Sequence, residues 1–134
     1  VPMVGNERSR WIYAFRSLLD AGAAMALSSD WGVSTLNPFQ IIETAVTRQV
    51  PGAEGKAPPF LPEERLTRAE AVAGYTVGAA AAAWRTADTG TLGIGKCADL
   101  IVLDRDIFSC PAHEIGGTNV IKTMVGGEVV HDRE

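Results

Sequence analysis

The stretch ALSSDWGV, residues 26–33, places an acid directly after a run of small and apolar residues. A carboxylate here, that of Asp30, could bind a divalent metal through oxygen and accept a proton from a metal-bound water. In eight-stranded β/α barrels, catalytic groups follow the carboxyl ends of strands, which is where Asp30 would lie if a strand precedes it. Aspartate also caps turns by accepting backbone hydrogen bonds, and the local sequence alone favours that simpler role.

Few other side chains have a pattern typical of catalysis or metal binding. His113 and His131 lie in the last third of the chain without an acid or histidine partner at a ligand spacing such as i, i+4 on a helix, so we expect surface histidines. Cys97 and Cys110 are the only cysteines. They are too few for a disulfide framework or a four-thiolate zinc site, and we expect them to be reduced and structural.

The segment GTLGIGKC, residues 90–97, is nearly the phosphate-binding loop of nucleotide hydrolases. That loop needs a strand before it, a helix after it and a hydroxyl for magnesium. Here a predicted helix precedes, a predicted strand follows, and Cys97 replaces the hydroxyl. The segment is therefore predicted to be a glycine-rich turn that leads into a strand.

The composition excludes several classes of partner. With 134 residues, of which 46% are hydrophobic, the chain can form one modest core. The formal charge of −4 is scattered, so there is no basic face for nucleic acid and no polybasic stretch for anionic lipid. No apolar run approaches the roughly 20 residues that cross a bilayer, and no secretory signal is recognisable. We expect a cytoplasmic protein with neither nucleic-acid nor membrane partners.

The elements that would position Asp30 can be predicted from periodicity. Residues 8–20 have the three-and-four apolar spacing of an amphipathic helix, which Gly22 would end. The segment AAMALS, residues 23–28, has no polar alternation and predicts a short strand covered on both faces, as in a parallel sheet. Asn37 as N-cap and Pro38 at the first position predict a second helix.

Further along the chain, prolines and glycines at residues 50–64 predict an irregular surface loop, whose length suggests a role over a site. Thr67 and Glu70 have capping-box spacing and predict a helix over about 68–83, with Tyr75 and Trp84 as packing residues. Two glycines in this helix, at positions 74 and 78, would permit close packing against a neighbour.

The last third is predicted to be β structure. ADLIVLD, residues 98–104, indicates a buried strand, and NVIKTMV, residues 119–125, a half-buried one. The pair Gly126–Gly127 predicts a tight hairpin of the primed type, and one helical turn is expected around 112–115.

Five segments together resemble the C-terminal end of metal-dependent amidohydrolases. They are RSLLDAGAAMALSSDWGV, NPFQIIETAVTR, LTRAEAVAGYTVGAAAA, TGTLGIGKCADLIVLDRD and VIKTMVGGEVV, which cover nearly the whole chain. GKCADLIVLD and VGGEVV are frequent across the superfamily. SSDWGV with AVTR is similar to the amidohydrolase-3 branch, which includes formamide-deformylase-like and exoenzyme-regulator-like proteins.

This resemblance implies an α/β fold, or α+β for this piece alone. Residues 1–88 would be the C-terminal portion of a metal-dependent hydrolase β/α barrel (a TIM barrel). Residues 89–134 would be the C-terminal strands of a small composite β-sandwich. The first residues, VPMVGNERSR, begin without Met and lead into a predicted helix, which is what a fragment of a longer protein would show.

By the same resemblance, Asp30 takes the place of the family's acid after the eighth strand, both catalytic and metal-contacting, which shuttles a proton from the attacking water to the leaving nitrogen. The cofactor implied for the longer protein is a divalent metal, zinc. The histidine and lysine ligands that the family places after earlier strands do not occur here, so no metal is expected on this piece alone. Trp31 is a candidate substrate contact, and packing against the barrel rim is equally plausible. Arg48 could bind a carboxylate substrate, although a solvated or ion-paired arginine at a helix end is favoured.

Two functions follow from these patterns. The first is the C-terminal part of a hydrolase that acts on C–N bonds of small amides or cyclic amides, inactive by itself. The second is a self-standing, non-catalytic α+β interaction module that dimerises. In both cases an isolated strand leaves unpaired edges and apolar faces, so we expect a homo-oligomer.

Overall fold

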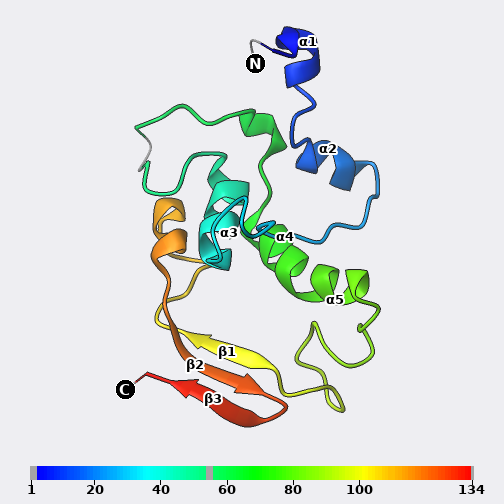
Figure 1. Cartoon of the computed structure of the whole chain (residues 1–134), viewed down its shortest axis with the longest axis vertical. Coiled ribbons are helices and arrows are strands. Elements are labelled where there is room, and N and C mark those ends of the chain that lie inside the picture. Colours follow the sequence, from blue (N-terminus) through cyan, green and yellow to red (C-terminus); the bar gives the residue numbers. More distant parts are fainter. Residues whose placement is uncertain (1–2, 54–55, 134) are drawn as a thin grey trace.

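The computed structural model describes residues 3–53 and 56–133, in which short helices lie on one side and a small antiparallel sheet on the other (Figure 1). The fold of these residues is α+β, as expected for this piece. The elements in chain order are α1 (Gly5–Ser9), α2 (Phe15–Asp20), α3 (Pro38–Thr47), η1 (Pro62–Glu64), α4 (Arg68–Ala73), η2 (Gly74–Gly78), α5 (Ala79–Ala82), β1 (Leu100–Leu103), η3 (Ala112–Gly117), β2 (Val120–Val125) and β3 (Glu128–Asp132).

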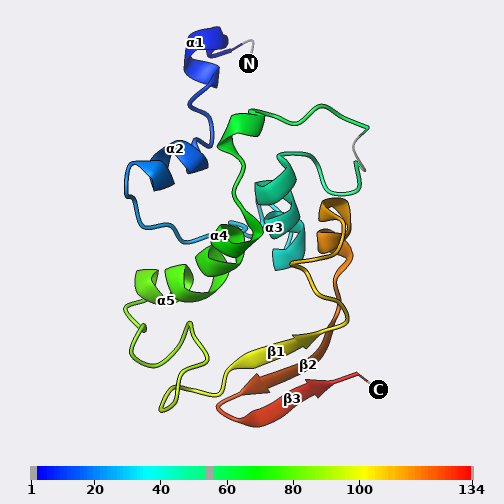
Figure 2. The ribbon, with the colours of Figure 1, turned by 180° about the vertical axis from the view of Figure 1, so that it is seen from behind.

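The core lies where α3, α4 and η3 meet, and the view from behind shows η3 beside α3 (Figure 2). Its buried members are all apolar: Phe39, Ile42, Ala45, Leu66, Ala71 and Ile115. One polar link crosses it, because the buried carboxylate of Glu43 accepts a hydrogen bond from Gly116 N at 2.7 Å. The accepted N–H compensates part of the cost of burying that carboxylate.

Both predicted helix starts are confirmed. The Asn37 side chain accepts from Phe39 N at 2.9 Å, with Pro38 in the first turn. Thr67 and Glu70 form the reciprocal capping box. The helix predicted over 68–83 is present as α4, a π-helical turn (η2) and α5. Trp84, however, is 96% exposed and does not pack, because a left-handed backbone at φ 57° turns it away just beyond α5.

The prediction of one helix over residues 8–20 is only partly right. α1 and α2 are separate, and Tyr13 between them has φ 55°. A continuous helix would use the carbonyls of residues 12 and 13 for its own ladder. Here Arg48 donates to both of them, at 3.5 and 3.2 Å, so a distant side chain competes with the local pattern. Gly22, at φ 85°, follows the end of α2 as predicted.

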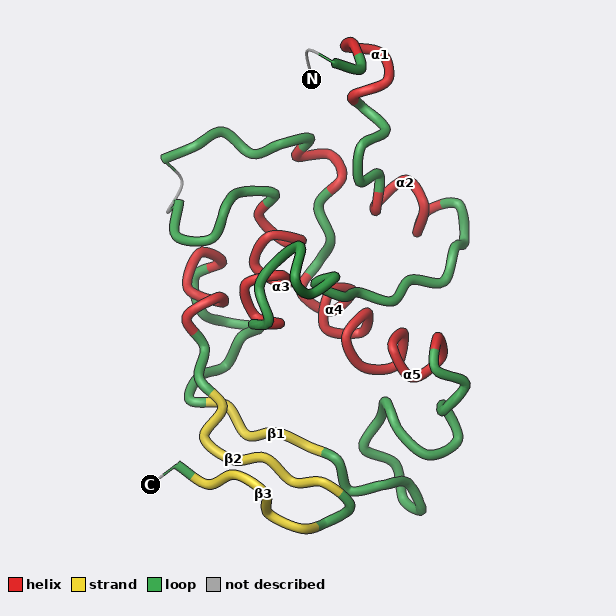
Figure 3. The backbone as a smooth tube through the Cα atoms, in the orientation of Figure 1, coloured by secondary structure: helices red, strands yellow, loops and turns green. Residues whose placement is uncertain are grey.

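The predicted buried strand over residues 23–28 does not form. The segment is non-helical coil, and the alternation of half-buried Met25 and Leu27 with exposed neighbours shows an extended course. Leu27 N donates to Gly74 O of the α4–η2 helix at 3.1 Å. Within the described residues no strand runs beside the segment, so a ladder has no partner backbone (Figure 3).

The sheet has the order β1-β2-β3, with both pairs antiparallel. Gly126 and Gly127 both have positive φ, 59° and 86°, which confirms the primed hairpin turn between β2 and β3. The predicted burial of the first strand is wrong, because Ile101 and Val102 of β1 are 48% and 42% exposed. None of the described segments covers both faces of this sheet.

The remaining connections largely follow the sequence. The loop at 50–64 is irregular up to η1, with residues 54 and 55 outside the described part. Residues 90–97 form a glycine-rich turn before β1, in which Lys96 Nζ donates to the carbonyls of Thr86 and Thr89, so the lysine closes a loop. The helical turn near 112–115 is present as η3. No helix among the described residues combines the length and the apolarity needed to cross a membrane.

Candidate functional site

Asp30 lies at the end of the extended segment 23–29, where that segment leaves the α4–η2 helix. The backbone of Asp30 is held locally: its N–H donates to Ser28 Oγ at 3.3 Å, and its carbonyl accepts from Val33 N at 2.6 Å. With φ 50° it adopts the left-handed region, which aspartate tolerates better than most residues. The result is a tight turn that carries the acid at its start.

The Asp30 side chain is exposed, and its carboxylate oxygens accept no hydrogen bond from the described residues. Among the described residues, the Asp30 side chain therefore does not form the turn cap that the local sequence favoured, and the turn is held by the Ser28 hydroxyl and the Val33 N–H. Such free oxygens suit an oxygen-binding divalent metal. Yet in the described ranges no three His, Cys, Asp or Glu side chains are grouped to hold a metal ion. Asp30 thus fits as one ligand of a metal site, but by itself it does not form a metal site.

Trp31 follows the acid and is 67% exposed. It does not pack into the core of the described residues, so its ring is open to a substrate or to packing against a barrel rim, the two roles considered for it. Val33 and Leu36 of the same loop are also largely exposed, at 83% and 66%. The loop around Asp30 therefore presents apolar surface beside a carboxylate.

Arg48 is neither solvated nor ion-paired, which corrects the favoured interpretation. It is buried, 7% exposed, and its guanidinium donates to the carbonyls of Phe60, Tyr13 and Ile12. Its Cζ atom lies 5.7 Å from the ring centroids of both Phe15 and Phe60. Burial lowers the pKa of Arg48, against the opposing attraction of Glu64. Its donors are used within the fold, so a substrate carboxylate would have to displace them.

The strongest charged contact ties α2 to α4. Arg16 of α2 makes a two-pronged ion pair with Glu70 of α4 and a weaker one with Asp20. The hydrogen bonds from Arg16 and then Thr67 lower the pKa of Glu70 to about 2. In the same region, hydrogen bonds from Ser17 lower the pKa of the buried Glu64. These carboxylates hold helices together, and their oxygen atoms are occupied by the hydrogen bonds that do so.

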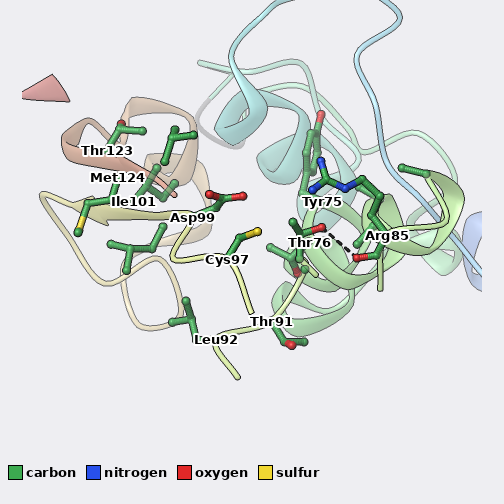
Figure 4. Close-up of a pocket in the computed structure, with 17 residues that line it drawn as sticks. Tyr75, Thr76, Arg85, Thr91, Leu92, Cys97, Asp99, Ile101, Thr123 and Met124 are labelled. Carbon is green, nitrogen blue, oxygen red and sulfur yellow. Dashed lines mark hydrogen bonds between the residues drawn. The ribbon is translucent and has the colours of Figure 1, made fainter. Parts of the chain in front are cut away.

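A cavity of about 720 Å³ lies between the η2–α5 helix and the sheet (Figure 4). Tyr75, Thr76 and Arg85 line one side, and Asp99 and Ile101 line the other. Asp99 is already engaged, because it accepts from Gly126 N at 2.7 Å. No sequence pattern predicted this cavity, since its walls come from residues far apart along the chain. Neither Asp30 nor Trp31 lines it.

The histidines lie where the sequence predicted, whereas only one of the two cysteines is even partly buried. His113 and His131 are exposed, which confirms that they are surface residues. Both cysteines are free thiols, Cys97 exposed and Cys110 half-buried. Of the polar side chains in the described part of the chain, Tyr75 has a buried hydroxyl without a hydrogen-bond partner, and burial raises its pKa.

Comparison with known proteins gives one consistent family. The sequence matches the amidohydrolase family over residues 1–131. An N-substituted formamide deformylase of Arthrobacter pascens is 35% identical over 96% of this chain and 23% of its own length. Protein LONG AFTER FAR-RED 3 of Arabidopsis thaliana is 34% identical, over 96% and 21%. An imidazolonepropionase of Parabacteroides distasonis is 29% identical, over 82% and 23%. The chain spans about a quarter of the length of these curated relatives.

Proposed function

The chain belongs to the amidohydrolase family, and from this premise we propose that it forms the C-terminal quarter of a hydrolase that cleaves C–N bonds of small amides or cyclic amides. In this proposal residues 1–88 contribute the last strand and flanking helices of a β/α barrel. Residues 89–134 contribute strands of a small composite β-sandwich. The extended, unpaired course of residues 23–29 supports this arrangement, because it leaves backbone groups available to neighbouring strands.

The names of two relatives support the reaction class. One is named for removing a formyl group from N-substituted formamides, and another for an imidazolone, a ring that contains an amide. Both kinds of substrate have a carbonyl carbon bonded to nitrogen. We therefore expect the same bond to be cut by the protein that contains this chain.

The observation that carries the site is the exposed carboxylate of Asp30 on a fixed backbone turn, which accepts no hydrogen bond from any described residue. Asp30 takes one proton from the attacking water while the water oxygen forms a bond to the carbonyl carbon of the substrate. It returns that proton to the nitrogen as the C–N bond breaks, so the products are a carboxylic acid and an amine. A bound divalent metal, which we propose to be zinc with Asp30 as this chain's ligand, would supply Lewis-acid polarisation.

Trp31 is the proposed substrate contact. Its ring is 67% exposed next to the acid and offers a large apolar surface for the part of the substrate that does not react. Substrate specificity would then depend on this ring together with loops outside this chain.

The reaction class can be tested with the enzyme that contains this chain, purified with its metal. We expect formate release from an N-substituted formamide or ring opening of a cyclic amide. Asp30→Asn should remove that activity, and Asp20→Asn, an exposed acid of α2, should keep it. Folded, metal-replete enzyme that cleaves neither substrate would contradict the proposal.

A non-catalytic, dimerising module is the second candidate, and one observation favours it. Val129 and Val130 of β3 and Ile101 of β1 leave apolar side chains exposed on the sheet, at 51%, 61% and 48%. A second copy of the chain could cover them.

A further inference from the structure

The segment that carries Asp30 crosses the α4–η2 helix at two glycines, Gly74 and Gly78. A methyl carbon added at Gly74 would lie 2.8 Å from Leu27 Cγ. One added at Gly78 would lie 2.1 Å from the Met25 carbonyl oxygen. Unstrained contacts of this kind are about 3.3–4.0 Å. Only glycine at these two positions lets the segment approach so closely.

The two contacts differ in which atoms could move to relieve the clash with the added carbon. At Gly74 the added carbon meets the branched end of the Leu27 side chain, and at Gly78 it meets backbone. A side chain can be shortened by substitution or can rotate, whereas the Met25 carbonyl moves only if the whole segment moves. Restoring an ordinary contact at Gly78 would require a displacement of about 1 Å.

The approach is fixed by a backbone hydrogen bond at the same place. Leu27 N donates to Gly74 O at 3.1 Å, where the α-helix gives way to the π-helical turn. Such turns interrupt the regular helical ladder and are frequent at functional sites. Asp30 follows three residues after Leu27, and its own N–H donates a hydrogen bond to Ser28 Oγ. A short, continuous set of contacts thus leads from the glycines to the acid.

We propose that Gly74 and Gly78 are positioning residues for the reaction, because they set the distance between segment 23–29 and the helix and thereby the place of the Asp30 carboxylate. This inference rests on the proposed function of Asp30. Neither glycine needs to touch substrate. A misplacement of a reacting group by about 1 Å lowers a rate about 100-fold, which sets the size of the expected effect.

The test compares kcat and KM in the enzyme that contains this chain. Gly78→Ala should lower kcat about 100-fold with little change in KM. Gly117→Ala is the matched control, because a methyl group there meets nothing within 4 Å, and it should keep the wild-type kcat. Gly74→Ala should also lower kcat and should speed hydrogen exchange of the Leu27 amide, a readout independent of catalysis.

A double variant separates positioning from stability. Adding Leu27→Ala to Gly74→Ala removes the atoms that the new methyl group meets, so kcat should rise above that of Gly74→Ala although a half-buried leucine is lost. A purely structural role predicts the opposite order. If Gly78→Ala does not fold, the comparison of Gly74→Ala with the double variant still tests the inference. A double variant whose kcat is no higher than that of Gly74→Ala would overturn it.

Asp30→Asn distinguishes the two levels of the proposal. If it loses activity while Gly78→Ala and Gly74→Ala match Gly117→Ala, the positioning role is wrong and the proposed function stands. If Asp30→Asn keeps full activity, the proposed function fails and the positioning role fails with it.

Discussion

Arg48 shows how one side chain can join parts of the fold that the sequence does not connect. It follows α3 with φ 59°, a left-handed residue beyond the helix end. From there its guanidinium reaches the carbonyls of residues 12 and 13 and that of Phe60. A planar fork of donors suits several carbonyls at once, which a lysine ammonium cannot reproduce.

We therefore expect Arg48→Lys to lower the free energy of unfolding by about 1–3 kcal/mol, because buried carbonyls lose their donors. Urea titration of the enzyme that contains this chain measures this. Arg65→Lys is the matched control, since Arg65 is exposed and its Nε donates to the single carbonyl of Thr47. Equal stability of the two variants would show that Arg48 does not hold these segments together.

At the scale of elements, α2 is attached to α4 mainly through the Arg16–Glu70 pair and to η1 through Ser17 and Glu64. Glu70 has two tasks, because it also completes the capping box of α4. Glutamine can complete a capping box but cannot form the ion pair. Glu70→Gln therefore removes the link between helices and keeps the cap.

The pH dependence of stability isolates that link. The pKa of Glu70 falls from 4.5 to about 2 on folding, so its contribution is complete above pH 4.5 and is lost as the pH falls towards 2. We expect the stability curve of Glu70→Gln to be flatter than that of the wild-type protein over this interval, as measured by urea titration at several pH values of the enzyme that contains this chain. Glu7→Gln, an exposed glutamate of α1, should run parallel to wild type. A Glu70→Gln curve that is also parallel would contradict the assignment.

The same scale shows what could be predicted from the sequence. The Asn37 cap, the Thr67–Glu70 box and the Gly126–Gly127 turn were predicted correctly, because each depends on residues within a few positions. The break near Tyr13 and the unpaired course of residues 23–28 were not, because they depend on Arg48 and on the absence of a neighbouring strand among the residues that the structure describes. Asp30 was proposed from its type and from family resemblance. The sequence predicted only close packing at Gly74 and Gly78, and their proximity to the Asp30 segment became apparent from their contacts.

For the whole molecule, the small core contrasts with the large apolar side chains that remain exposed. Trp84, Leu92 and Ile94 are essentially uncovered, at 96%, 80% and 109% exposure. The sequence pattern predicts buried strands, but the described residues bury less apolar surface among themselves than that pattern predicts. Either the rest of a barrel or another copy of the chain would cover these groups.

Size-exclusion chromatography of the 134-residue chain, with dye binding to apolar surface, distinguishes these cases. As part of a larger hydrolase, the chain alone should bind the dye strongly and elute as a broad, concentration-dependent range of aggregates. A sharp, stable dimer that does not bind dye would instead support the interaction module.

The most direct test of the central claim, that Asp30 moves the proton in amide hydrolysis, is the ratio of kcat values for wild-type and Asp30→Asn enzyme at equal metal content. Asparagine keeps the size and the tolerance for the left-handed turn but cannot take up the proton. We predict that kcat falls by about 10²- to 10⁴-fold, the range for loss of a general acid–base group. An unchanged kcat would contradict the account.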